Sequence, residues 1–144
     1  MKKIFICLTA PFPSVRIFNI GLLFFRVAVS LELIVVHGLK KLGIGVTQAE
    51  TIPNPLHLPD AFNSAFAIAA NIFFPFFILI GLCTRLAALP ILAVTLTGYF
   101  ILHWIDAALI RDTPFIYSVV FILLLFIGPG KYSLDYLINK KMNR

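Results

Sequence analysis

Ionisable side chains occur inside the most apolar stretch of the chain, residues 17–39. Arg26, Glu32 and His37 lie within the sequence IFNIGLLFFRVAVSLELIVVHGL. As a helix these residues would extend roughly 35 Å, which is enough to cross a bilayer. A charge at mid-membrane depth costs roughly 2.5–3.5 kcal/mol on insertion scales, so such side chains face other protein or a water-filled cavity. The three residues are therefore the first candidates for a functional site.

A second set of polar residues occurs in or beside the later apolar stretches. Tyr99, His103 and Asp106 follow one another at intervals of four and three residues, which places them on one face of a helix. Asn71 and Asp112 lie in or next to the neighbouring stretches. Imidazole, carboxylate, phenol and amide groups can bind a small polar ligand and exchange a proton with it. All five residues are candidates for ligand binding.

The same histidines could in principle bind a metal ion or a haem. His37 and His103 are suitable ligand types, but no HxxH or HExxH spacing accompanies them. A bis-histidine haem is compatible with two membrane helices, yet both histidines come near the ends of their apolar stretches. They are therefore weak metal candidates, and no resident cofactor is assigned.

The elements that must position these residues are membrane helices. Of the 144 residues, 60% are hydrophobic and 12% are charged, whereas a soluble domain has about 25% charged residues. The net charge of +6 could suggest a nucleic-acid partner. However, the lysines and arginines flank the apolar stretches, where topology signals occur. The composition predicts an integral membrane protein in contact with the lipid bilayer and no nucleic-acid partner.

Glycine and proline divide the chain into four membrane helices that form a single all-α domain, residues 1–144. A long apolar run breaks at GLCTR, and five glycines and prolines prevent a regular helix in the first connection. The expected architecture is a four-helix bundle with a surface-lying C-terminal tail. The predicted helices are 17–39, 63–82, 86–105 and 114–128, the loop is 43–60, and the tail is 131–144.

The distribution of basic residues predicts the orientation of these helices. With the N-terminus inside, eight lysines and arginines lie on the cytoplasmic side and three on the other. Both termini are therefore expected to be cytoplasmic. This topology brings His37, His103, Asp106 and Asp112 to the extracytoplasmic end of the bundle, with Asn71 somewhat deeper.

Five motifs together resemble the DoxX family of small bacterial membrane proteins. They are HGLKKL at 37–42, IPNPLHLP at 52–59, ILIGLCTRLAALP at 78–90, YFILHWID at 99–106 and IGPGKYSLD at 127–135. The resemblance implies four transmembrane helices in the bacterial inner membrane. It also implies that Arg26, His37 and His103 match family positions and that Asp112 takes the place of a family glutamate. Asn71 replaces another family glutamate, which puts a proton-transfer role at that position in doubt.

The resemblance implies a redox setting. Relatives include subunits linked to quinol oxidation or to thiosulfate:quinone oxidoreduction, and others assemble with soluble redox enzymes. The leading hypothesis is a membrane subunit or anchor of a quinone-linked system with a ligand site at its outer end. Catalysis, if present, would be that of an oxidoreductase subunit. The alternatives are a non-catalytic scaffold or assembly protein, and a small metal- or solute-handling transporter that would need to form a homo-oligomer.

Overall fold

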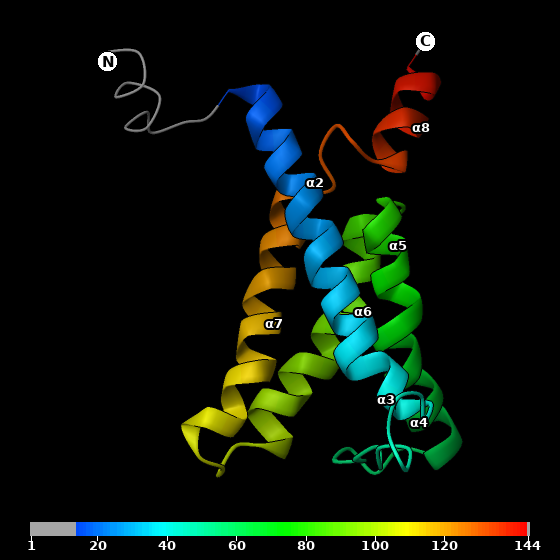
Figure 1. Ribbon diagram of the computed structural model, residues 1–144, viewed down its shortest axis with the longest axis vertical. Helices are drawn as coiled ribbons and strands as arrows, with labels where there is room; N and C mark the ends of the chain where they lie inside the picture. The colour runs from blue at the N-terminus through cyan, green and yellow to red at the C-terminus, as the bar shows by residue number, and fades with distance from the viewer. Residues whose placement is uncertain (1–13, 144) are drawn as a thin grey trace.

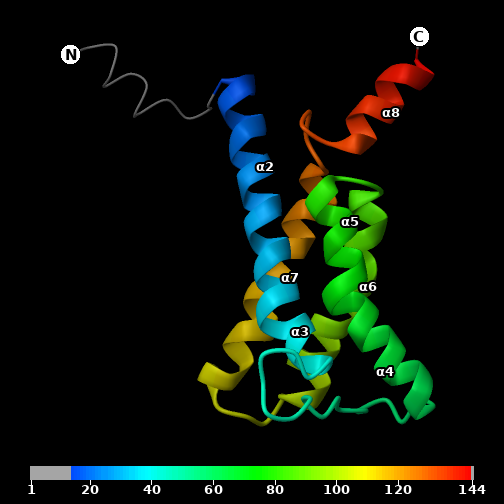
Figure 2. The same ribbon diagram turned by 45° about the vertical axis from the view of Figure 1, so that its right-hand side comes forward.

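The computed structural model describes residues 14–143, whose regular secondary structure is all helical, with no strand in this part of the chain. Within these described residues, four continuous helical stretches are long and apolar enough to cross a membrane, as the composition predicts. Figures 1 and 2 both place the loop between the first two stretches at the end of the bundle opposite the C-terminal helix. The four stretches are Val15–Lys41, Asp60–Ile80, Thr84–Leu102 and Ala108–Ile127.

A π-helical turn interrupts each of the first two membrane stretches and ends the third. The first stretch consists of α2 (Val15–Glu32), η1 (Leu33–Gly38) and α3 (Leu39–Lys41). The second consists of α4 (Asp60–Ile68), η2 (Ala69–Phe73) and α5 (Phe74–Ile80). The third consists of α6 (Thr84–Thr97) and η3 (Gly98–Leu102). Such turns are rare and often mark functional sites. They hold three of the candidate residues, His37, Asn71 and Tyr99. The wider turn also changes which residues share a helix face, so a 3.6-residue period does not describe these regions.

The first two membrane stretches cross closely at Gly38. A Cβ atom there would lie 2.6 Å from Cγ1 of Ile72 and 2.7 Å from the carbonyl oxygen of Asn71. Only glycine leaves room for this approach, as is common where membrane helices pack on small residues. The crossing fixes the half of the first stretch that lies nearer the loop 42–59 against η2.

The fourth membrane stretch, α7 (Ala108–Ile127), begins six residues before the predicted start at residue 114. Pro114 therefore lies inside the helix rather than at its first position. Proline removes the bond to the carbonyl of Ile110. Because Ile110 is exposed near the helix end, its carbonyl can bind water or lipid headgroups instead. The connection after η3 is correspondingly short, residues 103–107.

Polar contacts join the C-terminal segment to the bundle at the end opposite the loop. Arg26 is 1% exposed, and its guanidinium donates hydrogen bonds to the carbonyl oxygens of Pro129 and Tyr132, the second at 2.8 Å. The carboxylate of Asp135 accepts from the backbone N–H groups of Cys83 at 2.7 Å and Thr84 at 3.0 Å, which caps the start of α6. These contacts hold the segment that leads into α8 (Leu134–Met142). That α8 lies along the membrane surface stays a prediction.

Candidate functional site

A cavity of about 350 Å³ lies beneath the loop 42–59, between this loop, α4 and the C-terminal part of the third membrane stretch. Its walls are mostly apolar, and a few polar side chains occur among them, which is typical of small-molecule sites. The polar lining residues are Lys41, Glu50, Asn63, Thr97 and His103, and the apolar ones include Ile52, Pro53, Pro55, Leu56, Leu58, Phe66, Val94 and Leu102.

Two asparagines hold the loop over the cavity. The side chain of Asn54 donates to the carbonyl oxygen of Leu58 at 2.6 Å and accepts from the N–H of the same residue at 2.9 Å. Asn63, in the first turn of α4, donates to the carbonyl oxygen of Pro53 at 3.0 Å. Since prolines in the loop lack backbone donors, side-chain amides replace the missing regular hydrogen bonding. The loop is thereby tied to the helix that it covers.

His103 and Asp106 form the strongest chemical pairing at the cavity. Nδ1 of His103 lies 2.7 Å from Oδ2 of Asp106. An ionised carboxylate only accepts, so the imidazole proton is on Nδ1, and Nε2 remains as the unpaired ring nitrogen. Both side chains are about a third exposed. The pair can therefore accept a proton at Nε2 and stabilise the imidazolium that results.

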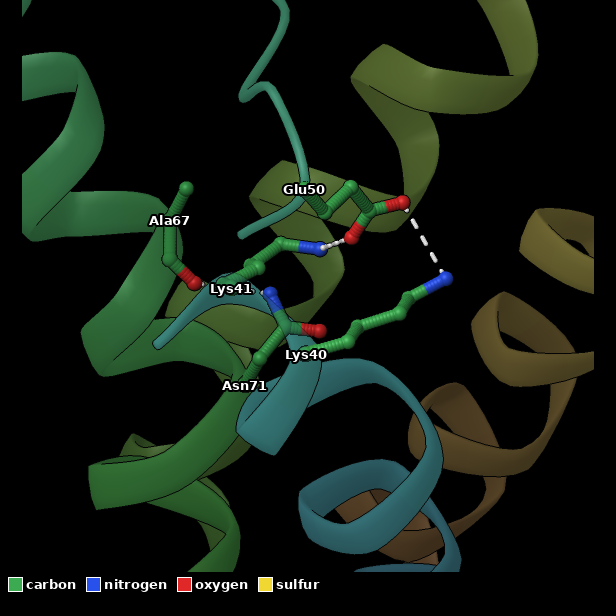
Figure 3. Close-up of polar contacts among 5 residues, drawn as sticks. All are labelled: Lys40, Lys41, Glu50, Ala67 and Asn71. Carbon is green, nitrogen blue, oxygen red and sulfur yellow. Dashed lines mark hydrogen bonds and ion pairs between the residues drawn. The ribbon is translucent and has the colours of Figure 1, made fainter. Parts of the chain in front are cut away.

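Glu50 is a site residue that the sequence analysis did not single out. Its two carboxylate oxygens bind Lys40 at 3.1 Å and Lys41 at 2.9 Å (Figure 3). Burial raises the pKa of Glu50, but hydrogen bonds from both lysines and their charges outweigh this effect and hold the pKa below its ordinary value. A signal was available, because Glu50 is the one acidic residue in the loop that follows two lysines.

The two histidines from the first and third membrane stretches do not share the cavity. His37, in η1, is not among the lining residues, and its ring packs edge-on against Tyr117 of α7 at a centroid distance of 5.3 Å. Asn71 is also turned to another partner, since its Nδ2 donates to the carbonyl oxygen of Ala67 at 2.7 Å within its own helix (Figure 3). The large cavity therefore contains His103 but not the other two.

The remaining candidate residues are distributed over the molecule. Arg26 binds the C-terminal segment at the far end of the bundle, so it does not line the cavity. Glu32 is exposed on the outside of the first membrane stretch. Tyr99 and Asp112 line a second, smaller cavity of about 170 Å³. Within residues 14–143, no three side chains among histidine, cysteine, aspartate and glutamate come together as a metal site.

The comparison with known families agrees with this architecture. The DoxX family model matches residues 21–104, more than half of the chain. The chain belongs to the DoxX family. The match includes Arg26, His37, Asn71 and His103 and ends two residues before Asp106. This DoxX protein is thus a multi-pass membrane protein whose spans contact lipid.

An uncharacterized protein of Haemophilus influenzae is 31% identical to this DoxX protein over 96 residues. The match covers 63% of this chain and 64% of that protein, a little less than two thirds of its length. No solved structure matches the chain. Function must therefore be argued from the site itself.

Proposed function

We propose that this DoxX protein is a bacterial inner-membrane subunit of a redox system that binds a quinone headgroup in the cavity lined by His103. The observation that carries the proposal is the His103–Asp106 pair at a loop-covered cavity whose walls are mostly apolar. A quinone ring is flat and apolar and bears two oxygens, so it needs an apolar pocket with one or two hydrogen-bonding side chains. Phe66, Val94 and Leu102 supply apolar walls.

The pair suits both redox states of such a ligand. The neutral imidazole can accept a hydrogen bond from a quinol hydroxyl at Nε2, and the imidazolium can donate one to a quinone oxygen. On oxidation of a quinol to a quinone, one of its two protons would pass to Nε2 and the other to solvent water, while both electrons pass to a redox partner protein. Asp106 would stabilise the resulting positive charge. Lys41, held by Glu50 at the rim, would add a positive potential that favours a partly reduced, negatively charged ring.

The proposed position in the membrane follows from the basic residues. With eight lysines and arginines on the side of the termini and three on the side of the loop, the cavity would face the extracytoplasmic side. A quinone diffusing in the bilayer could then reach it at the outer headgroup boundary. This placement also leaves the C-terminal segment available to partner proteins in the cytoplasm.

A scaffold without a ligand is the second candidate. The buried Arg26 supports this function, because its guanidinium donates to backbone carbonyl groups of the C-terminal segment and joins two parts of the chain. In that case Arg26→Leu would abolish assembly with a partner, while changes at His103 would have no effect. Transport has less support, since Ile91, Phe121 and Leu124 close the centre of a single bundle.

The test is quinone binding to the full-length protein in lipid nanodiscs. Trp104 is the only tryptophan and follows His103 directly, so its fluorescence can follow a titration with a short-chain quinone. We expect saturable quenching in the wild type and at least about tenfold weaker binding in His103→Ala, because a tenfold change corresponds to one lost hydrogen bond of roughly 1.4 kcal/mol.

The matched control is the other histidine near the cavity. His57 belongs to the loop 42–59 that covers the cavity, but it is not a lining residue. Its backbone φ of 52° is one that asparagine tolerates. His57→Asn should therefore bind the quinone as the wild type does. Equal affinity in all three proteins, or quenching that rises linearly without saturation, would contradict quinone binding at His103.

A further inference from the structure

Arg111 carries an unneutralised charge at the second, smaller cavity. Its guanidinium lies over the ring of Tyr99 at 4.6 Å and over that of Trp104 at 5.2 Å. Its Nε atom is buried without a hydrogen-bond partner, and within the described chain no carboxylate lies within ion-pair distance of the guanidinium. The two rings fix the guanidinium in place but supply no negative charge. The two Nη groups, unlike Nε, are not buried and make no hydrogen bond within the described residues, so they can donate to an external acceptor.

The cavity also contains a carboxylate. Asp112 lines it together with Arg111, and in residues 14–143 Asp112 makes no ion pair. A simple anion would be attracted by Arg111 and repelled by Asp112. A simple cation would be attracted by Asp112 and repelled by Arg111. A ligand that bears both charges a few atoms apart satisfies both side chains. The charge pattern therefore favours a zwitterion.

The position of the cavity selects a lipid as the source of this zwitterion. The cavity lies where Thr84–Leu102 ends and α7 begins, at the level where tyrosine and tryptophan occur at a membrane interface. Its volume of about 170 Å³ accommodates a group of several heavy atoms. Exposed apolar side chains continue from it along α7, namely Phe115, Ile116, Val119, Ile122 and Leu123, and offer a surface for an acyl chain.

We propose that this cavity binds the headgroup of a phospholipid with a primary amine, with the phosphate on Arg111 and the ammonium on Asp112. A phosphate matches the planar donors of a guanidinium. The first turn of α7 has no side-chain cap at Ala107, so its free backbone N–H groups add to the attraction for phosphate. A quaternary amine fits less well, because the aromatic faces that would hold it already carry Arg111. The site is independent of the His103 cavity and of the function proposed there.

The test is lipid retention by the full-length protein in detergent, measured by native mass spectrometry. Phosphatidylethanolamine, phosphatidylcholine and phosphatidylglycerol of identical chains are offered together. We expect the ethanolamine lipid to be retained at least about fivefold over the choline lipid in the wild type. Equal retention of the three lipids would overturn the proposal, because it would show binding by the acyl chains alone.

Two variants separate the roles of the two charges. Arg111→Gln should lose retention of both phosphatidylethanolamine and phosphatidylglycerol, while Arg85→Gln, an exposed arginine at the other end, should retain both. Asp112→Asn should shift the lipid preference toward phosphatidylglycerol. Asp112 is exposed, so this substitution should leave the fold intact. An unchanged preference in Asp112→Asn would refute the assignment of the ammonium.

A water-soluble analogue distinguishes the lipid from its free headgroup. Glycerophosphoethanolamine has the same charges without acyl chains. We expect it not to displace the bound lipid at equal concentration, because it lacks the contact with α7. Displacement at equal concentration would overturn the lipid as the natural occupant.

Discussion

Replacing Arg26 with methionine should strongly destabilise the protein, because Arg26 joins the first helix to a segment more than 100 residues away. Its side chain is 1% exposed and donates to the carbonyl oxygens of Pro129 and Tyr132. Methionine matches the aliphatic part of the arginine side chain without a charge, but it lacks the guanidinium nitrogens that reach the two carbonyl oxygens. The change therefore removes the hydrogen bonds and leaves most of the packing.

The magnitude follows from the two bonds. A hydrogen bond to a charged group contributes about 1.5–3 kcal/mol, so two bonds contribute about 3–6 kcal/mol. Part of this is regained, because methionine does not bury a charge in a poorly solvated site. A net loss of about 2–4 kcal/mol remains. At roughly 2–4 °C per kcal/mol, the midpoint of thermal unfolding should fall by about 4–16 °C.

The assay is thermal unfolding in detergent followed by circular dichroism. Arg85→Met is the matched control, since Arg85 is exposed at the same end and makes one longer bond of 3.2 Å to the carbonyl oxygen of Phe126. We expect the control to change the free energy of unfolding by no more than about 0.5 kcal/mol. If both variants unfold at the same temperature as the wild type, Arg26 does not hold the C-terminal segment.

Three further changes test other contacts. Gly38→Ala should lower the midpoint of thermal unfolding by several degrees, because the added Cβ would collide with the second membrane stretch. Gly21→Ala is the control and should not lower it, since a Cβ there meets nothing within 4 Å. Equal midpoints in the two variants would disprove the close crossing. Asp135→Asn should weaken the cap of α6 and speed maleimide labelling of the exposed Cys83, and an unchanged labelling rate would argue against that cap. The pKa of Glu50 lies below its ordinary value of 4.5, so its ion pairs stabilise the loop fully above about pH 4.5, and this stabilisation is lost as the pH falls through the lowered pKa. Glu50→Gln should remove that part of the acid dependence of unfolding, and identical pH profiles would show that the ion pairs contribute nothing.

The fold could be predicted from the sequence because it depends on one dominant property. Four apolar stretches separated by glycine, proline and basic residues allow few arrangements in a bilayer. Helix boundaries were harder to predict at prolines, because a proline occurs both at the first turn of a helix and inside a membrane helix. Pro114 indicated the start of a helix, but the structure has it one and a half turns inside α7.

The site was predicted only in part, for two physical reasons. Arg26 binds backbone carbonyl groups, and these leave no trace in the side-chain pattern of a segment 103 residues away. The π-helical turn at 33–38 changes the helix face on which His37 lies, so arithmetic with 3.6 residues per turn could not show that it packs on Tyr117. By contrast, the spacing did place His103 and Asp106 close together, but on one helix face, whereas the structure ends the helix at Leu102 and joins the two side chains across the turn 103–106.

Photocrosslinking measures quinone binding in the His103 cavity most directly. A quinone with a photoreactive group would be irradiated with the protein in nanodiscs, and the modified peptides would be identified by mass spectrometry. We expect adducts in residues 50–67 and 93–103 that an excess of unmodified quinone suppresses. Adducts confined to the lipid-facing surface of α7, or adducts that the competitor does not reduce, would contradict a quinone site at His103.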